Sequence, residues 1–172
     1  MVRKVMVIGD THALNFKEMP SQMIQEIIDS EFVIHTGDYT SIKIVDRLME
    51  LKTDKFIGVH GNADRMAIRK LVPSKRIVEI EGIKIGVCHP VTGGPSSLIQ
   101  SKVKSEFQDK NLDIIIFGHT HEAIIEKQSD YWLLSPGKGY LEENTFGPPT
   151  SYIRLLLGGN QINPELVIIQ TK

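Results

Sequence analysis

The sequence predicts an α/β fold, and three observations support this prediction. Five short apolar segments rich in β-branched residues each end on an Asp, Asn or His. The first three alternate with segments of helical periodicity, which is the order of a parallel β-α-β-α-β unit. The remainder of the chain contains mostly short strands and one long helix. With 172 residues, the chain can bury a sizeable core, and we expect residues 1–172 to form a single domain.

Three strands and two helices are predicted in the first half. The strands are Val2–Ile8, Phe32–Thr36 and Lys55–Val59. The first helix should begin near Pro20, since proline suits the first helical position, and its spacing predicts a buried face of Met23, Ile24, Ile27 and Ile28. Thr40 or Ser41 can cap the second helix, whose predicted buried face is Ile44, Val45, Leu48 and Met49.

The second half begins with a predicted hairpin of Arg76–Glu81 and Ile83–Cys88, joined at Glu81-Gly82. A helix capped by Ser96 or Ser97 should follow, with apolar residues Leu98, Ile99, Val103 and Phe107. The remaining predicted strands are Asp113–Phe117, Ala123–Glu126, Tyr131–Leu134, Ser151–Leu157 and Leu166–Gln170.

The composition excludes several classes of protein. Hydrophobic residues make up 41% and charged residues 24%, which is typical of a globular domain. The net charge of -1 does not favour nucleic-acid binding. Cys88 is the one cysteine, so it cannot form an internal disulfide, and we expect it to be a small buried residue. The sequence resembles neither a signal peptide nor a membrane span of about 20 apolar residues, so a cytoplasmic protein without membrane contact is expected.

Polar residues at the ends of the five segments form a candidate site. In open α/β sheets, ligands bind outside the carboxyl ends of the strands, so these residues should converge. They are Asp10, His12, Asp38, Asn62, His89, His119 and His121. Carboxylate oxygen and imidazole nitrogen suit manganese, iron, zinc, nickel or cobalt, and the absence of thiolates argues against structural zinc. The set is large enough for two ions.

The spacing within the set supports metal binding. In extended backbone, residues two apart point to the same side, so one ion could take both members of Asp10/His12 or His119/His121. A glycine precedes Asp10, Asp38, Asn62 and His119. Glycine lets the backbone turn sharply close to an ion.

The ordered motifs resemble those of the calcineurin-like metallophosphoesterases. They are Gly9-Asp10-Thr11-His12, Gly37-Asp38, Gly61-Asn62, His89 and Gly118-His119-Thr120-His121. The turn Ser135-Pro136-Gly137 and the segment Gly147–Ile153 are similar to the small bacterial and archaeal phosphodiesterase branch of that family. The resemblance implies an α/β sandwich of two packed β-sheets flanked by helices. It also implies hydrolysis of a small phosphodiester.

The resemblance further implies a division of the ligands. One ion would be held by Asp10, His12 and His121, and the other by Asn62, His89 and His119, with Asp38 bridging both. A water or hydroxide bridging the ions would be the nucleophile. Manganese is the first expectation for the metal, with nickel, iron, zinc and cobalt as alternatives. The chain could also form a homodimer or homotetramer.

Four positions depart from the family pattern or remain open. Ala63 stands where many relatives have a histidine that protonates the leaving group, and His60 is a candidate replacement acid. Lys138 stands where relatives often have serine; we expect a solvated turn residue, with a phosphate contact as the alternative. His35 is expected to support the site from the core rather than to bind metal.

Two other functions stay open. The retromer-subunit-like branch of the family is a non-catalytic scaffold for protein interactions, but it has typically lost part of the histidine pairs that are intact here. A phosphomonoesterase or nucleotidase would use the same residues as a phosphodiesterase. The intact pairs favour an enzyme.

Overall fold

The computed structural model describes residues 1–91, 93–108, 110–141 and 147–170. Its strands are β1 (Arg3–Ile8), β2 (Phe32–His35), β3 (Phe56–Gly58), β4 (Lys75–Ile80), β5 (Ile83–Cys88), β6 (Ile114–Phe117), β7 (Ala123–Lys127), β8 (Trp132–Pro136), β9 (Ser151–Gly158) and β10 (Gln161–Ile168). Its helices are α1 (Ser21–Asp29), α2 (Ile42–Lys52), α3 (Met66–Arg69) and α4 (Ser96–Glu106), with 3-10 turns at Phe16–Glu18 and Thr53–Lys55.

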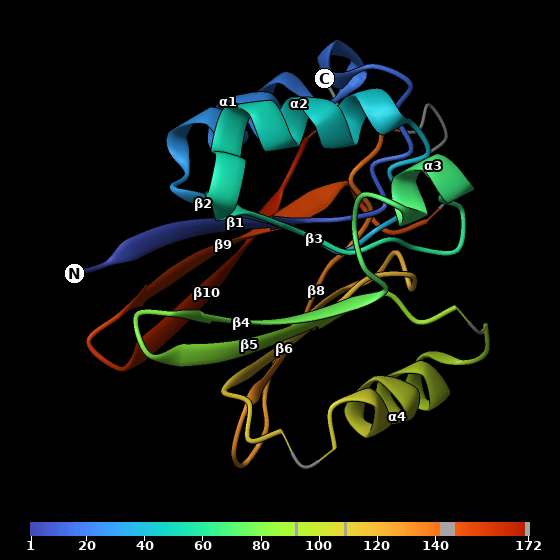
Figure 1. The fold of residues 1–172 in the computed structure, drawn as a ribbon. Helices are drawn as coiled ribbons and strands as arrows, with labels where there is room; N and C mark the ends of the chain where they lie inside the picture. The colour runs from blue at the N-terminus through green and yellow to red at the C-terminus, as the bar shows by residue number, and fades with distance from the viewer. Residues whose placement is uncertain (92, 109, 142–146, 171–172) are drawn as a thin grey trace.

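The strands form two five-stranded sheets that pack face to face (Figure 1). The first has the order β10-β9-β1-β2-β3, and β1, β2 and β3 are parallel as predicted. The second has the order β4-β5-β6-β8-β7, in which β5, β6 and β8 are parallel and the two edge strands are antiparallel to their neighbours. The predicted sandwich of two sheets flanked by helices is therefore confirmed.

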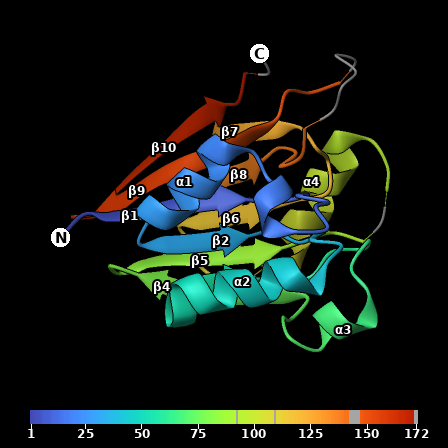
Figure 2. The ribbon, with the colours of Figure 1, turned by 90° about the horizontal axis from the view of Figure 1, so that it is seen from above.

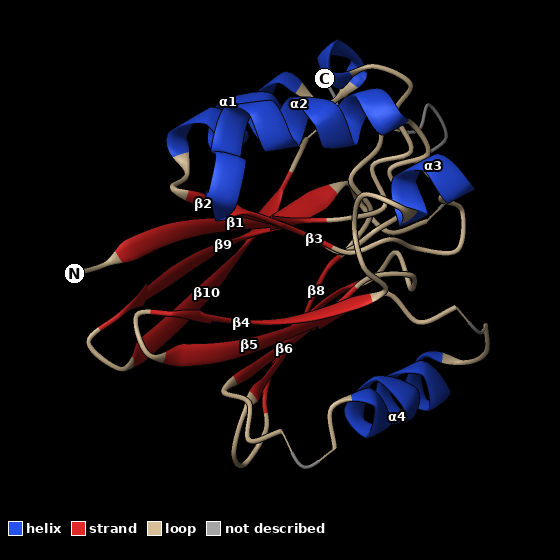
Figure 3. Ribbon diagram, in the orientation of Figure 1, coloured by secondary structure: helices blue, strands red, loops and turns tan. Residues whose placement is uncertain are grey.

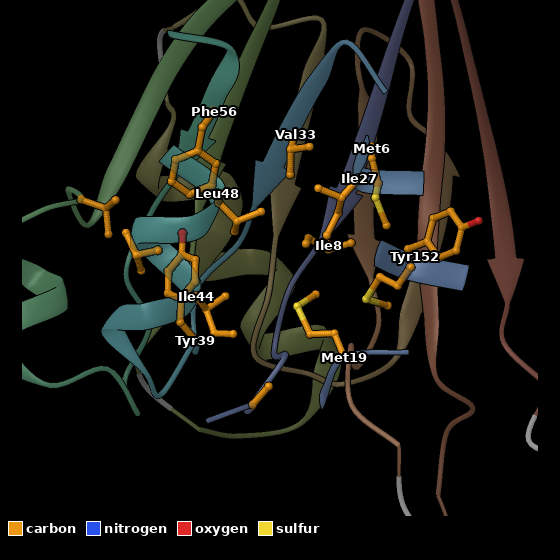
Figure 4. Packing of buried hydrophobic residues seen from close by; sticks show 14 of the residues in the cluster. Met6, Ile8, Met19, Ile27, Val33, Tyr39, Ile44, Leu48, Phe56 and Tyr152 are labelled. Atoms are coloured by element: carbon orange, nitrogen blue, oxygen red, sulfur yellow. The ribbon is translucent and has the colours of Figure 1, made fainter. Parts of the chain in front are cut away.

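The core is layered because the central strands bury both of their faces. On β1, Val5 and Val7 point into the cluster between the two sheets, whereas Met6 and Ile8 join the cluster beneath α1 and α2 (Figure 4). The helix α4 covers the outer face of the second sheet through a third cluster, which includes Val103 (Figure 3). Each fully buried aliphatic side chain contributes about 1.5–3 kcal/mol to this packing.

Some helix and strand details differ from the prediction. Ile28 and Leu98 are 52% and 45% exposed, because the buried stripes of α1 and α4 are narrower than the sequence suggested. Helix α4 follows Pro95 and makes no side-chain cap hydrogen bond at that position. The strand β10 starts five residues before Leu166, since it is an exposed edge strand without a continuous apolar run. The short helix α3 was not predicted.

The loops that follow β1, β2, β3, β5 and β6 gather at one end of the sandwich (Figures 1 and 2). This is the end at which the carboxyl termini of the parallel strands of both sheets lie. The arrangement brings segments from residue 9 to residue 121 together. Within the described parts of the chain, no helix has the length and apolar content needed to cross a membrane.

Candidate metal centre

All seven predicted residues lie in the loops at this end of the sandwich, and they come from both sheets. Those from the first sheet are Asp10, His12, Asp38 and Asn62, and those from the second are His89, His119 and His121. Five of them have a positive φ: Asp10 (47°), His12 (44°), Asp38 (57°), His119 (87°) and His121 (58°). The assumption of extended backbone at the two pairs was therefore wrong. Such left-handed conformations are costly for residues other than glycine and cluster at functional sites.

The glycines before these residues are needed for space. A Cβ on Gly61 would overlap the Asp38 carboxylate, and one on Gly37 would lie 2.7 Å from the Gly61 nitrogen. Of these two, only Gly37 also has a positive φ, of 106°. The backbones of the two loops can therefore approach each other closely.

One group of candidate ligands is Asp10, His12 and His121. One ligand atom from each lies within 4.8 Å of the others. Asp10 Oδ1 is 3.2 Å from His121 Nε2. Asp10 Oδ1 and His12 Nε2 are buried, and the described residues offer neither atom a hydrogen-bond partner. Because an unpartnered buried polar atom is costly, these atoms fit a bound cation.

The second group is built around His89. Its Nδ1 lies 2.8 Å from the carbonyl oxygen of Thr36, which can only accept, so Nδ1 carries the proton. In the neutral ring, Nε2 is then a lone-pair atom, yet it lies 3.0 Å from Asn62 Oδ1 and 3.4 Å from Asp38 Oδ2. His119 Nδ1 is 2.8 Å from the same Asn62 oxygen. The Asn62 and Asp38 oxygens are acceptors that both lie close to the His89 Nε2 lone pair, and a cation would suit this cluster.

Asp38 stands between the two groups. Its Oδ2 is 3.4 Å from His89 Nε2 and 4.0 Å from His12 Nε2, and its Oδ1 accepts a hydrogen bond from the Ala63 backbone at 2.8 Å. The structure thus brings the seven residues together at one end of the sandwich, and ligand atoms of Asp10, Asp38 and His89 also lie within 4.8 Å of one another. Which residue binds which ion stays a prediction.

Burial and charge act in opposite directions on the two aspartates. Burial by itself would raise the pKa of Asp10, but the contact with His121 and the nearby His89 hold that pKa below its usual value. For Asp38, burial dominates and raises the pKa, with only partial compensation from His89. The Asp10 carboxylate raises the pKa of His121, whereas burial lowers the pKa of His119. A cation at the site would favour the ionised form of both carboxyls.

His35 supports the site from the core, as predicted. It is fully buried, and burial lowers its pKa to about 3, so the ring is neutral. Its Nδ1 accepts the Gly37 backbone N–H at 3.1 Å, which leaves Nε2–H to donate to Thr11 Oγ1 at 3.1 Å. The ring also stacks on Tyr39, with centroids 3.8 Å apart. His35 therefore connects the loops that carry the two aspartates.

Asp64 is a supporting residue that the sequence did not reveal. It is 3% exposed, and its carboxylate accepts backbone hydrogen bonds from Asp38 at 2.9 Å, Thr40 at 3.0 Å and Gly61 at 2.8 Å. It thereby fixes the loop after β2 to the loop after β3. Its position two residues after Asn62, where an Asp can accept turn N–H groups, was the available signal.

The expectation for Lys138 was wrong. This lysine is 5% exposed rather than solvated, because its backbone forms a β-bridge with Thr150 and its Nζ lies 5.2 Å from the centre of the Tyr140 ring. Tyr140 itself packs against His12 and His121 and was missed. The only sequence signal was that it follows the Ser135-Pro136-Gly137 turn.

His60 is partly buried, and its backbone N–H donates to Pro73 at 2.9 Å. Among the described residues, no hydrogen bond or ion pair joins its side chain to the seven candidate ligands. Its role as a replacement acid stays a prediction.

Cys88 is buried, 3% exposed, as predicted.

Comparisons with known proteins agree with this geometry. Residues 4–157 match the family profile described as the calcineurin-like phosphoesterase superfamily domain. The chain is 36% identical over 132 residues to a probable metallophosphoesterase of Methanocaldococcus jannaschii; the match covers 76% of this chain but only 65% of that relative, slightly less than two thirds.

Two further comparisons involve different kinds of protein. A phosphodiesterase of Methanocaldococcus jannaschii is 27% identical over 153 residues, which cover 80% of this chain and 86% of that protein. The structure of Vacuolar Protein Sorting 29 from Cryptosporidium parvum superposes with a TM-score of 0.72 at 23% identity, covering 99% of each chain. The latter similarity concerns the fold alone. The profile match over most of the sequence shows that this chain belongs to the calcineurin-like phosphoesterase superfamily.

Proposed function

We propose that this protein is a metal-dependent phosphodiesterase that uses two divalent transition-metal ions. The observation that carries the proposal is the position of Asp38 Oδ2, which lies between His12 of one ligand group and His89 of the other. Family membership supports a phosphoesterase, and a relative named as a phosphodiesterase supports the diester. Manganese is the first metal to test, followed by nickel, iron, zinc and cobalt.

In this proposal the seven residues divide as the family resemblance implies. Asp10, His12 and His121 would hold one ion, Asn62, His89 and His119 would hold the other, and Asp38 would contribute to both. Bound ions of this kind would supply Lewis-acid chemistry, which activates water for the hydrolysis of a phosphate ester. With two ions of charge +2 and two aspartates, the site keeps a charge of about +2. It therefore attracts an anionic diester.

The remaining work of the chain is to position these ligands. His35 and Asp64 fix the loops that carry the aspartates, through hydrogen bonds to Thr11, Gly37, Asp38 and Gly61. Ala63 contributes a backbone N–H to Asp38 and has no side chain that could donate a proton. The departing oxygen would thus receive no proton from this position, and esters with poor leaving groups should react slowly.

The test compares metal-stripped and metal-loaded protein. Chelated protein should not hydrolyse bis(p-nitrophenyl) phosphate, and manganese should restore the activity as the metal content approaches two ions per chain. Hydrolysis of p-nitrophenyl phosphate, measured in parallel, distinguishes a diesterase from a monoesterase or nucleotidase. Undiminished diester hydrolysis after complete chelation would overturn the proposal.

Leaving-group dependence sharpens the test. We expect Ala63→His to accelerate diesters of alkoxide-like leaving groups more than those of nitrophenol, provided that the new ring reaches the departing oxygen. If His60 is a substitute acid, His60→Ala should slow the poor leaving groups selectively. An equal rate across leaving groups of very different pKa would contradict the idea that no efficient acid operates.

The alternative is a non-catalytic scaffold of the retromer-subunit-like type. The intact ligand set does not favour it, because a scaffold has no need for unpartnered buried ligand atoms. A protein that binds two ions but hydrolyses neither monoester nor diester would support it. The proposal includes a small diester substrate in the cytoplasm, and light scattering would test whether the chain forms a dimer or tetramer.

A further inference from the structure

The segment from Lys138 to Tyr140 lies against the loop that carries Asp10 and His12. The Gly139 N–H donates to the Asp10 carbonyl at 3.1 Å, and a Cβ on Gly139 would lie only 2.6 Å from the Gly9 oxygen. On the other side, Thr150 Oγ1 donates to the Tyr140 carbonyl at 2.5 Å. The backbone of Tyr140 is therefore held in place relative to the first group of candidate ligands.

The Tyr140 side chain contacts both histidines of that group. Its ring meets His12 edge to face at 5.2 Å between centroids and 85°, and His121 at 5.7 Å and 79°. Its hydroxyl oxygen lies 3.3 Å from His121 Nδ1. The segment therefore touches all three members of the group: Asp10 through Gly139, and His12 and His121 through the Tyr140 ring.

The orientation of His121 gives the hydroxyl a defined role. His121 Nε2 faces Asp10 Oδ1 at 3.2 Å, so Nε2 must be unprotonated if the two atoms are to share one cation. The proton of the neutral ring is then on Nδ1, where Tyr140 Oη can accept it. Hydrogen bonds of this kind fix the tautomer and orientation of metal-binding histidines.

We infer that Tyr140 is a positioning residue for the ion held by Asp10, His12 and His121, and that it acts on this ion rather than on the one at Asn62, His89 and His119. The inference rests on the proposed two-ion function. It accounts for the contacts of the Tyr140 ring with His12 and His121 and for the contact of its hydroxyl with His121. No motif of the sequence assigns this role.

The experiment measures manganese binding to the metal-free protein by electron paramagnetic resonance, without substrate. A mononuclear ion gives a six-line spectrum, whereas two adjacent ions give a coupled spectrum. Tyr140→Phe keeps the ring and removes the hydroxyl, so we expect one of the two sites to weaken about tenfold or more, with the other within twofold of wild type. The six-line signal should persist at manganese concentrations that already give the coupled spectrum in wild type.

Two further variants and a control locate the effect. Tyr140→Ala should weaken the same site more, since both histidine rings lose a packing partner. In a His121→Ala background, Tyr140→Phe should cause no additional loss, because the hydrogen bond is already absent. Tyr131→Phe changes a partly buried tyrosine packed in the third core cluster and should leave both sites unchanged.

Equal weakening of the two sites in Tyr140→Phe, no weakening at either, or a full additional loss in the His121→Ala background would overturn the inference. The readout also separates it from the proposed function. Wild-type protein that binds two manganese ions but hydrolyses no phosphate ester would refute the phosphodiesterase and leave the role of Tyr140 to be decided by these titrations. Wild-type protein that binds fewer than two ions would overturn both.

Discussion

Two clusters in this molecule bury carboxylates, and they balance the negative charge in different ways. Glu26 on α1 is 8% exposed and accepts hydrogen bonds from Arg154 at 2.8 Å and Tyr152 at 3.1 Å, while Lys4 pairs with it at 2.9 Å. Asp10 and Asp38 are 0% and 3% exposed and face histidines instead. The protein supplies the cations at Glu26, whereas at the aspartates buried lone pairs remain for a cation from outside.

The comparison separates residues that stabilise the fold from residues that serve the site. Arg154 and Lys4 offset the cost of burying Glu26, and the Arg154 guanidinium lowers the pKa of that carboxyl to about 2. At Asp38, burial outweighs the opposing effects of His89 and the Ala63 N–H and raises the pKa, so its charge is compensated less fully than that of Glu26. Substitution of Glu26 should therefore lower the stability and leave metal binding unchanged. Substitution of Asp38 should weaken metal binding without lowering the stability.

The largest effect is expected for Asp38→Ala. Because Asp38 faces both ligand groups, its removal should lower the turnover of bis(p-nitrophenyl) phosphate at least about 10³-fold and reduce the metal content of the loaded protein. The metal-free protein should unfold at the same temperature as wild type or higher, since a poorly compensated buried carboxylate is gone. Asp46→Ala, at an exposed position on α2, is the matched control. Turnover near wild type would refute the bridging role.

Glu26→Gln should show the reverse behaviour. Removing the charge breaks the ion pair with Lys4 and leaves Arg154 with Glu165 alone, so the free energy of unfolding should fall by about 3 kcal/mol. Manganese affinity and turnover should stay within twofold, because Glu26 lies outside the site. Urea unfolding measures the first quantity, and Glu50→Gln on the surface of α2 serves as the control. Loss of metal binding in Glu26→Gln would contradict the separation of the two clusters.

Asp64→Asn should have a smaller effect on turnover than Asp38→Ala and a larger one than Glu26→Gln. The amide keeps an acceptor oxygen, but it brings an N–H group toward the backbone donors of Asp38, Gly61 and Thr40, so the two loops should lose their fixed separation. We expect turnover to fall about tenfold to 100-fold, with weaker manganese binding. The exposed Asp54→Asn is the control. An unchanged manganese affinity would mean that the loops do not need this connection.

The smallest expected effect is the loss of the stability contribution of Glu26 at low pH. The folded-state pKa of Glu26 is about 2 against an ordinary value of 4.5, so its contribution to stability is complete above pH 4.5 and is lost as the pH falls toward 2. Between pH 5 and pH 3, metal-free wild type should lose about 1–2 kcal/mol more than Glu26→Gln does. Urea unfolding at the two pH values measures the difference. Equal losses in the two proteins would assign the acid sensitivity to other groups.

The apolar runs of the sequence predicted the parallel strands and placed the candidate ligands at one end of them, whereas the two packed sheets were predicted from the family resemblance. Buried parallel strands are visible as apolar runs, and a polar residue directly after each run must lie at the shared end of the sheet. Asp10, Asp38 and His89 could be located in this way. The helix α3, with only four residues, gave no periodic signal.

The supporting residues could not be found in the same way, because their contacts cross long stretches of chain. Asp64 is 26 residues from Asp38, and Tyr140 is 19 residues from His121. Their hydrogen bonds depend on how loops from different strands meet, which no local pattern records. The burial of Lys138 likewise depends on its pairing with Thr150. The prediction from residue spacing assumed an extended loop and was wrong, because the backbone of Asp10 and His12 is left-handed.

The division of the candidate ligands between the two sheets has a consequence for the lifetime of the protein. A cation bound to residues of both sheets must be released before the sheets can separate. Since it binds the folded state alone, it would add about 2.7 kcal/mol to the unfolding free energy at a free concentration 100 times its dissociation constant. Metal starvation would then do more than stop a reaction: it would raise the fraction of molecules in which the sheets have separated, and proteases would degrade the protein faster.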